Sequence, residues 1–441
     1  MNSLNKQRLI KRFSAFLNEE EAVQTGNLDS VYLEFAKKKA VFEEKAHKYP
    51  TPFYIFDKKL FNSHVLEFVK TFENYIPNTK VFYAIKSNPH FFLLRSLHKM
   101  EIGLDCSSGI EIKHALKNSG QPLLFTGPAK MDSELRLVIK HPDRITLNID
   151  SFAELQRIGE LTNIHRKRIK AGVRIYTSIH GSWSKFGIPL EKLLDFFKLS
   201  QKYPFIDLQG IQVHISWNFD SEPYINVIEQ IGHYLGSHFA KKMINKISYI
   251  DLGGGFFPEQ TEGNHFSSTN VGTIHQVLFE NKKITSKLEN DHYFYQTTPV
   301  EKYARDIAKG LSEYIHPLFE NKPNIYFEPG RIFSTYSMHI LLRIRDIKEG
   351  RIIITDGGTN MIGWEKFEED YCPVINLTHP SSKEIKCTIY GSLCTPSDIW
   401  GYFCYAKKME VGDLLLIPNQ GAYTYTFAQN FIKEFPKVYK C

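Results

Sequence analysis

The sequence of 441 residues contains no apolar run that approaches the ~20 residues required to span a membrane. Its first twenty residues, MNSLNKQRLIKRFSAFLNEE, are amphipathic and basic. They acquire glutamates at once and lack the apolar core of a secretory signal, so an ordinary N-terminal helix is expected there. The sequence therefore predicts no membrane partner.

Cysteine is scarce, and the few cysteines are far apart in a long chain. They form no CxxC pair, and no histidine-rich tract accompanies them, which argues against a zinc site and against a disulfide framework. We therefore expect no metal and a reduced, cytoplasmic setting. The six cysteines are Cys106, Cys372, Cys387, Cys394, Cys404 and Cys441.

Dense positive charge is also missing. The net charge of +7 is spread thinly along the chain. The two densest basic stretches, NKQRLIKRF near the N-terminus and HRKRIK at 165–170, have no nucleic-acid-binding motif around them. Both are interpreted as solvated helix faces, so no nucleic-acid partner is expected.

Apolar runs and amphipathic stretches alternate regularly between residues 81 and 329. Alternation of this kind indicates a parallel sheet, and a count of eight strands indicates a closed (β/α)8 barrel. A doubly wound open sheet is less favoured because no GxGxxG follows the first strand. The expected strands are 81–85, 102–106, 122–127, 144–150, 170–176, 208–215, 247–253 and 324–329.

The pattern changes after residue 331, where strand-like runs such as MHILLRIRDI, GDLLLIPNQG and YTYTF follow one another without helices. We predict an α/β chain in three parts: a helical extension at 1–50 that packs partly on the β domain, the barrel at 51–331, and an all-β domain at 332–441. The long polar segment 258–298 is expected to be an insertion in the barrel, either a functional lid or disordered.

One strand ends in a charge: VFYAIKSNPH places Lys86 directly after an apolar run. The lysine could extend into solvent, or its amine could form a Schiff base with a carbonyl cofactor. Active sites of such barrels lie at the carboxyl ends of the strands. Besides Lys86, these ends carry Asp105, Arg174, His214, Gly253-Gly254-Gly255, Glu328 and Arg331.

Each of these residues also has an ordinary interpretation. The glycines could form only a turn, His214 could be a core histidine, and FEPGR could hold a surface ion pair. Together, however, they provide an amine for an aldehyde, a backbone nest for an anion, a flat ring, a carboxylate and a guanidinium. That set suits pyridoxal 5′-phosphate, PLP.

With these motifs in view, the sequence resembles the fold-type III PLP-dependent decarboxylases, the group of diaminopimelate, ornithine and carboxynorspermidine decarboxylases. The resemblance runs from about residue 51 to 435 through FYAIKSN, GLDCSSGIE, SKFGI, GIQVHIS, DLGGGF and FEPGR. It implies that Lys86 binds the aldehyde, His214 stacks on the ring and Glu328 contacts the pyridine nitrogen. It also implies further cofactor contacts from Asp105, Arg174, Ser216, Gly253, Gly254, Gly255 and Arg331.

Two motifs of the β domain extend the resemblance. GSLCTPSD implies that Cys394 is a catalytic proton donor, with Asp398 four residues on, and GAYTYTF implies that Tyr423 binds phosphate. In this family the cysteine reaches the site of the partner subunit, so an obligate homodimer with shared sites is implied.

Three departures from the family pattern matter, one for the phosphate and two for the substrate. Ser216-Trp217 stands where the family has Gly-Ser, so either Ser216 serves the phosphate or the loop is rebuilt around the ring. Thr395 replaces the glutamate typical of diaminopimelate decarboxylases. The segment DGGTNMIGWEK offers Trp364 and Glu365 in place of an arginine.

We therefore predict a specialised amino-acid substrate, in siderophore, polyamine or other secondary metabolism, with diaminopimelate as the alternative. Glu365 and Asp398 would suit a cationic tail, while Trp217 and Trp364 would suit an apolar one. The predicted substrate-binding residues are Arg331, Asp398, Trp364, Glu365 and Thr395.

Rival functions are a racemase, a non-catalytic PLP-binding protein and a degenerate scaffold subunit. Racemases of the family place an arginine where Glu328 stands, and the non-catalytic proteins lack a β domain. The presence of Lys86, Glu328 and Cys394 argues against a degenerate subunit. The sequence thus favours a PLP-dependent carboxy-lyase that releases carbon dioxide and an amine.

Overall fold

The computed structural model describes Gln7, Leu9 and residues 28–181, 184–216, 218–258, 263–265, 292–294, 297–363 and 370–441. The chain divides into two compact units. The first, here the β unit, comprises Met1–Asp57, Pro258–Thr297 and Thr335–Cys441. The second, here the barrel unit, comprises Lys58–Phe257 and Thr298–Ser334. Within the described residues, no helix has the length and apolar character to cross a membrane.

Eight parallel strands form the barrel in the order β5-β4-β3-β2-β12-β9-β8-β6, and pairing of β5 with β6 closes it. A short ninth strand, β7 (Ile188–Pro189), adds to the edge of β6. The predicted (β/α)8 barrel is confirmed. The eight strands are β2 (Thr79–Ala84), β3 (Gly103–Cys106), β4 (Leu123–Phe125), β5 (Ile145–Ile149), β6 (Ile169–Tyr176), β8 (Ile206–Gln212), β9 (Tyr249–Asp251) and β12 (Asn324–Phe327).

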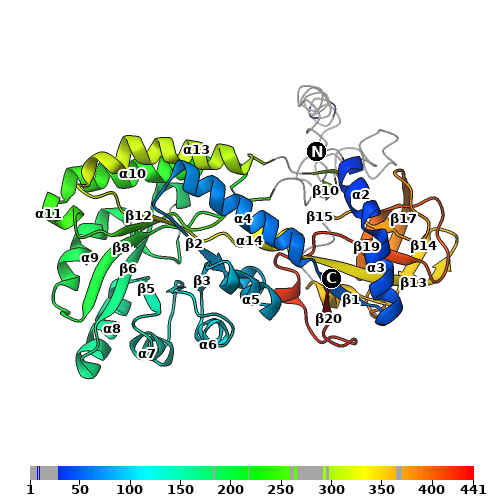
Figure 1. The fold of residues 1–441 in the computed structure, drawn as a ribbon, viewed down its shortest axis with the longest axis horizontal. Helices are drawn as coiled ribbons and strands as arrows, with labels where there is room; N and C mark the ends of the chain where they lie inside the picture. The colour runs from blue at the N-terminus through cyan, green and yellow to red at the C-terminus, as the bar shows by residue number, and fades with distance from the viewer. Residues whose placement is uncertain are drawn as a thin grey trace. The chain divides into compact units, whose positions relative to one another are not determined.

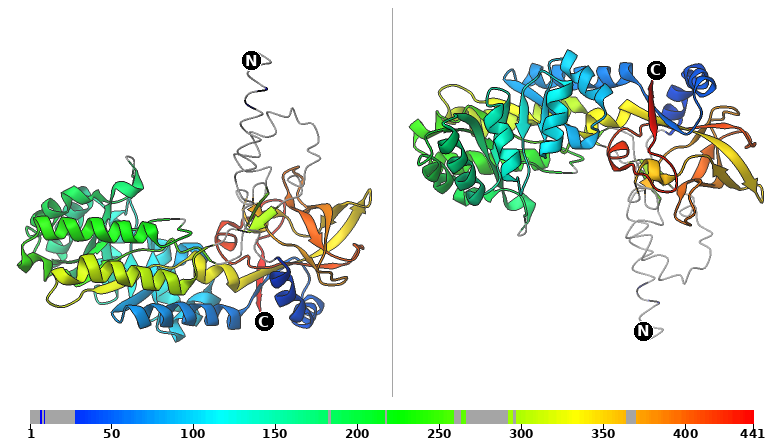
Figure 2. Two further views of the ribbon diagram at one scale, coloured as in Figure 1. Left: turned by 90° about the horizontal axis from the view of Figure 1, so that it is seen from above. Right: turned by 90° about the horizontal axis from the view of Figure 1, so that it is seen from below.

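Helices surround these strands, and α4, α10 and α13 lie side by side (Figures 1 and 2). Two helices begin with a serine cap: Ser108 accepts a hydrogen bond from Glu111 N–H, and Ser151 accepts one from Glu154 N–H. The helices are α4 (Lys58–Tyr75), α5 (Phe91–Lys99), α6 (Gly109–Asn118), α7 (Asp132–Lys140), α8 (Phe152–His165), α9 (Leu193–Ser200), α10 (Glu222–His238), α11 (Lys241–Ile244), α13 (Val300–Gly310) and α14 (Arg331–Ser334).

The ring of Tyr249 fills the barrel interior because two neighbouring strands carry glycine. A Cβ at Gly210 would lie 2.0 Å from this ring, and one at Gly172 would lie 2.2 Å from its hydroxyl. The hydroxyl donates to Asn148 Oδ1 at 2.9 Å, which satisfies the buried phenol. The barrel is therefore a packed core, and its chemistry is confined to the strand ends.

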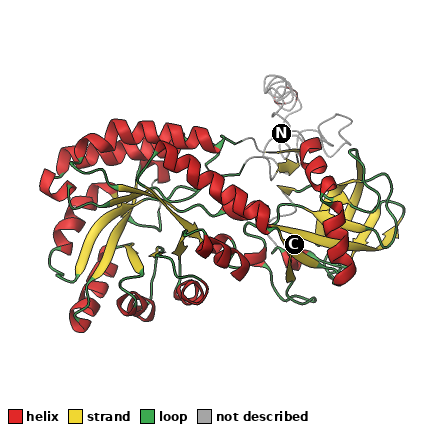
Figure 3. Cartoon of the chain, in the orientation of Figure 1, coloured by secondary structure: helices red, strands yellow, loops and turns green. Residues whose placement is uncertain are grey.

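The β unit contains an eight-stranded mixed sheet in the order β14-β17-β18-β16-β19-β13-β1-β20. Figure 3 shows strands of this unit in yellow. Its strands are β1 (Phe53–Phe56), β13 (Met338–Lys348), β14 (Ile352–Thr355), β16 (Ile375–Asn376), β17 (Glu384–Tyr390), β18 (Ile399–Tyr405), β19 (Leu414–Ile417) and β20 (Lys437–Lys440). Helices α2 (Leu28–Lys37) and α3 (Lys39–Lys48) pack on this sheet through Phe35 and Phe42, which share a core cluster with Phe53, Leu341 and Leu416.

Two predicted boundaries need correction. The strand Phe53–Phe56, assigned above to the barrel, pairs instead with β13 and β20 of the β sheet. The described parts of segment 258–298, β10 (Gly263–His265) and β11 (His292–Phe294), pair with each other. Strand β10 also pairs with β15 (Asp370–Tyr371), so this insertion belongs to the β unit.

The predicted strand YTYTF is also wrong. Tyr423 has a positive φ of 58°, which breaks an extended strand, and Tyr425–Phe427 form a 3-10 helix.

Candidate active site

Lys86 lies in a short 3-10 turn that directly follows the barrel strand β2. Strand β2 ends at Ala84, and Ile85–Ser87 form a 3-10 helix. Ser87 Oγ donates to Ala84 O at 2.9 Å, and Tyr83 Oη donates to Asn88 O at 3.0 Å, so the turn is held on both sides of the lysine. Lys86 is half-buried, and its ammonium has no hydrogen bond or ion pair with any described residue. Its amine is therefore available.

A buried carboxylate, Glu328, follows β12 and is only 2% exposed. Gln212 Nε2 donates to both of its oxygens at 3.4 Å, and Thr126 Oγ1 donates to Oε1 at 3.4 Å. Hydrogen bonds of this length are weak, so the protein holds the carboxylate of Glu328 only loosely through them. Neither Gln212 nor Thr126 was predicted. Gln212 could have been found, because residues two apart in a strand share one face, so Gln212 lies on the same face of the strand as His214.

Two more carboxyl groups, Asp105 and Asp251, are buried at neighbouring strand ends. Burial raises the pKa of both well above the ordinary value, and the charge of Glu328 raises each further. Burial acts to raise the pKa of Glu328 as well, but contact with His214 and the charge of Lys86 outweigh it and leave that pKa lowered. Of the three buried groups, Glu328 therefore keeps the negative charge.

His214 is a neutral ring at neutral pH. Burial, followed by the charge of Lys86, lowers its pKa to about 4. Its Nδ1 accepts a hydrogen bond from Gly254 N–H at 3.1 Å and lies 3.4 Å from Glu328 Oε2. The imidazole is thus fixed beside the ionised carboxylate.

The glycine loop differs from the predicted three-amide nest. Gly253 N–H donates to Asp251 Oδ1 at 2.9 Å and Gly254 N–H donates to His214, so only Gly255 N–H has no acceptor among the described residues. The glycines themselves are required: Gly253 and Gly255 have φ of 70° and 89°, and a Cβ at Gly254 would lie 2.3 Å from Glu328 O.

Arg174 contacts the motif SKFGI through Phe186. The Arg174 guanidinium lies 4.3 Å from the centroid of the Phe186 ring, and its Nη1 lies 4.0 Å from Asp150 Oδ1. Asp150 Oδ1 also accepts from Gly187 N–H at 3.1 Å. The side chain of Arg331, predicted for phosphate or substrate, lies 5.1 Å from the ring centroid of Phe257.

A second lysine, Lys130, is fully buried and was not predicted. Its ammonium donates to Gly127 O at 2.6 Å, Asn148 O at 2.9 Å and Glu154 Oε1 at 2.8 Å. All three donor positions are filled, so Lys130 ties the ends of β4 and β5 together and has no free amine. Lys130 therefore differs from Lys86, whose ammonium has no hydrogen bond with any described residue.

In the β unit, Cys394 is exposed in the loop that precedes β18. Asp398 anchors this loop: its Oδ2 accepts from Leu393 N–H at 2.7 Å, and its Oδ1 accepts from Thr359 N–H at 2.7 Å and Thr359 Oγ1 at 3.0 Å. Thr395 Oγ1 lies 3.1 Å from Ser397 Oγ. These bonds give Asp398 a structural role, and its part in substrate binding stays a prediction.

Of the remaining predicted residues, the structure describes Ser216 and Tyr423 and does not describe three others. Ser216 is exposed, and Tyr423 occupies the left-handed region, a strained conformation for a residue other than glycine. Trp217, Trp364 and Glu365 lie outside the described residues.

The barrel-end arrangement fits PLP. Within the described part of the chain, Lys86 offers an amine without a hydrogen-bond partner, and Glu328 accepts hydrogen bonds of 3.4 Å from Gln212 and Thr126. Asp105 Oδ1, Asp251 Oδ2 and Gln212 Oε1 are buried without a hydrogen-bond partner among the described residues. Buried polar atoms without partners are rare in folded proteins and call for a functional explanation.

Residues 62–335 match the family described as "Pyridoxal-dependent decarboxylase, pyridoxal binding domain". The chain is 22% identical over 406 residues to a diaminopimelate decarboxylase of Campylobacter jejuni, an alignment that covers 88% of this chain and 90% of that protein.

Two solved structures are similar in fold. One is diaminopimelate decarboxylase from M. jannaschii in complex with L-lysine, with TM-score 0.73, 23% identity, and coverage of 90% of this chain and 89% of that one. The other is lysine/ornithine decarboxylase from Vibrio vulnificus complexed with putrescine, with TM-score 0.70, 18% identity, and coverage of 92% and 98%.

The raised pKa of Asp251 leads to a prediction about stability. An acid with a raised pKa in the folded state stabilises the fold below its unfolded pKa and loses that contribution as pH rises. Asp251→Asn imitates the protonated acid, so we expect it to raise the melting temperature of the protein at pH 8 relative to wild type. The gain should shrink toward pH 4 in thermal unfolding curves.

Asp207→Asn is the matched control, because Asp207 is exposed on the neighbouring strand β8 and should show no such pH-dependent gain. Equal stability of wild type and Asp251→Asn across this pH range would show that Asp251 is not held neutral.

Proposed function

The chain belongs to the pyridoxal-dependent decarboxylases, and from that membership we propose that it removes the α-carboxylate of an amino acid with a second amino group at its far end. It is a PLP-dependent carboxy-lyase. The observation that carries the proposal is the pairing, at one end of the barrel, of the partner-free amine of Lys86 with the ionised carboxylate of Glu328.

In this proposal five parts of the barrel end hold the cofactor. Lys86 binds the aldehyde carbon through its amine, and Glu328 keeps the pyridine nitrogen protonated. The neutral ring of His214 packs on the cofactor ring, held by Gly254 N–H. Gly255 N–H donates to the phosphate, and Asp105 lies at the strand end next to that of Lys86.

When bound, PLP supplies an electron sink that lets the bond to the α-carboxylate break with loss of carbon dioxide. Glu328 sustains this sink because its negative charge favours a proton on the ring nitrogen. A racemase is less well supported, since that function would replace the carboxylate with an arginine. The raised pKa of Asp251 and the lowered pKa of Glu328 concentrate negative charge on Glu328.

Cys394 is proposed to return a proton to the α-carbon in the site of a partner subunit. Its exposure in the β unit supports such a shared site. The β unit also exposes four large apolar side chains in one short segment, which a partner surface could cover. They are Phe427 at 52%, Phe431 at 39%, Ile432 at 55% and Phe435 at 40% exposed.

Diaminopimelate is the first candidate substrate. The similar Campylobacter jejuni protein and the similar M. jannaschii structure are both diaminopimelate decarboxylases, which supports this alternative better than a specialised substrate. The lysine/ornithine decarboxylase of Vibrio vulnificus shares the fold, and its substrates also carry a distal amine.

A specialised substrate remains the second candidate because of Thr395. A hydroxyl cannot neutralise a distal ammonium as a glutamate would, and a site that leaves a charged end unpaired loses affinity through desolvation.

The cofactor assignment predicts which lysine becomes labelled. The absorption spectrum of the purified protein should show bound PLP. Reduction with borohydride should attach the cofactor covalently to the peptide that contains Lys86. Lys130 is the internal control, because three acceptors occupy its ammonium. A label on Lys130, or on neither lysine after PLP is supplied, would contradict the assignment.

The shared site predicts complementation between two inactive variants. Cys394→Ala should lower kcat by about 10²–10⁴-fold, the usual worth of a positioned proton donor. When it is mixed with Lys86→Ala, heterodimers contain one site with both native residues, so up to half of the heterodimer's sites should be active. Heterodimers that form but show no activity would exclude a shared site.

The substrate proposal predicts that kcat/KM for meso-diaminopimelate exceeds the values for lysine, ornithine and conjugated amino acids. The Thr395→Glu variant separates the two candidates. It should improve turnover of diaminopimelate if Thr395 faces the distal amine. Best turnover of a conjugated or apolar amino acid by the wild type would instead support the specialised substrate.

A further inference from the structure

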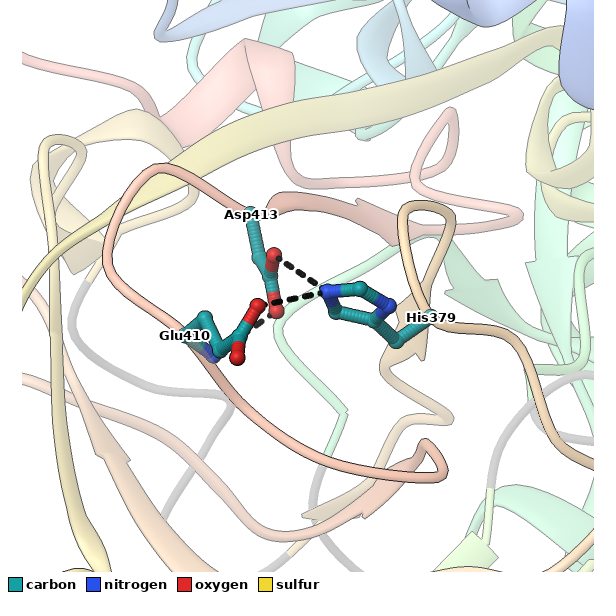
Figure 4. A group of neighbouring side chains, drawn as sticks. All are labelled: His379, Glu410 and Asp413. Carbon is teal, nitrogen blue, oxygen red and sulfur yellow. Dashed lines mark hydrogen bonds and ion pairs between the residues drawn. The ribbon is translucent and has the colours of Figure 1, made fainter.

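Three metal-ligating side chains meet in the β unit, outside every residue used above (Figure 4). His379 Nε2 lies 2.9 Å from Glu410 Oε2 and 3.5 Å from Asp413 Oδ1. His379 follows β16, whereas Glu410 and Asp413 lie in the loop between β18 and β19. Figure 4 shows the imidazole directed at both carboxylates.

The Asp413 carboxylate is fixed in place by its other oxygen. Asp413 Oδ2 accepts from Asn376 Nδ2 and from Glu410 N–H, both at 2.8 Å, and the side chain is only 4% exposed. Oδ1 is thereby turned toward His379. A carboxylate oriented by hydrogen bonds of this kind is typical of metal sites.

The His379 backbone is fixed as well. Its N–H donates to Asn376 Oδ1 at 2.9 Å, and its carbonyl accepts from Lys407 N–H at 2.9 Å. Asn376 thus binds both the histidine turn and Asp413. The fold holds the two loops together, so the three ligands are arranged before any ion arrives.

From this geometry we propose that His379, Glu410 and Asp413 bind one divalent transition-metal ion, with zinc the best fit. Bonds of about 2.1 Å in a tetrahedron place ligand atoms about 3.4 Å apart. The separation of 3.5 Å between His379 and Asp413 matches this, and the exposed Glu410 side chain can lengthen its 2.9 Å contact with His379. One imidazole and two carboxylates suit zinc better than magnesium or calcium, which prefer oxygen alone. Glu410 is 54% exposed, which leaves room for water as the fourth ligand.

Two side chains near the site affect metal binding. A metal needs the lone pair of His379 Nε2, so binding requires the tautomer that carries its proton on Nδ1. The ammonium of Lys408 lies 2.8 Å from Glu410 Oε1 and neutralises part of the site's charge. Removal of the Lys408 charge should therefore strengthen zinc binding.

The test is calorimetric titration of the holoenzyme with zinc chloride after dialysis against chelator. Wild type should bind one equivalent more than His379→Ala, and zinc should raise the melting temperature of wild type more than that of the variant.

Lys408→Gln should bind this equivalent about fivefold more tightly, as loss of an exposed ion pair allows. X-ray absorption at the zinc edge should show one nitrogen and three oxygen ligands.

His233→Ala is the matched control. His233 forms a similar contact with a single carboxylate, 3.4 Å from Glu229 Oε1 on α10, and its loss should leave the zinc stoichiometry unchanged. Equal zinc binding by wild type and His379→Ala would overturn the proposal. The proposal would also fail if His379→Ala lost the same stability with and without zinc, because the three side chains would then form only an ion-pair cluster.

Discussion

One constraint governs the barrel end: three carboxyl groups are buried within reach of one another, and the low dielectric there cannot support three negative charges. Asp105 and Asp251 respond with raised pKa values, while Glu328 keeps its charge because His214 and Lys86 favour it. The neutral Asp251 then caps Gly253 through Oδ1. Charge placement and loop geometry are therefore set by the same residues.

Glycine allows these groups to come close together. A side chain at Gly254 would collide with the carbonyl of Glu328, and one at Gly255 would lie 2.0 Å from Ile215 O. Below them, Gly172 and Gly210 admit the Tyr249 ring into the barrel. The strand ends can approach this closely only because those positions lack Cβ atoms, so cofactor binding and barrel packing depend on glycine in the same way.

The sequence predicts the barrel well because each buried strand is a short apolar run between amphipathic helices. Lys86, Glu328 and His214 could be located because strand ends in such a barrel face one site. Gln212 was not predicted because its partner Glu328 is distant in sequence. Lys130 was not predicted because its three acceptors come from a loop, a strand and a helix that only the folded chain brings together. Strand Phe53–Phe56 was misplaced for a related reason: FYIF suits either sheet, and only its pairing with Leu341 and Lys437 decides the matter.

The β-unit loops show why a motif locates a residue better than it defines a role. Asp398 stands near Cys394 and seemed suited to a cationic tail, yet both of its oxygens accept hydrogen bonds from Leu393 and Thr359. A substrate ammonium that took over this carboxylate would leave buried backbone N–H groups without partners, which costs about 1–3 kcal/mol for each. The hydrogen bonds of Asp398 therefore favour a role in fixing the loop that carries Cys394, and recognition of a distal amine is better served by another carboxylate or carbonyl.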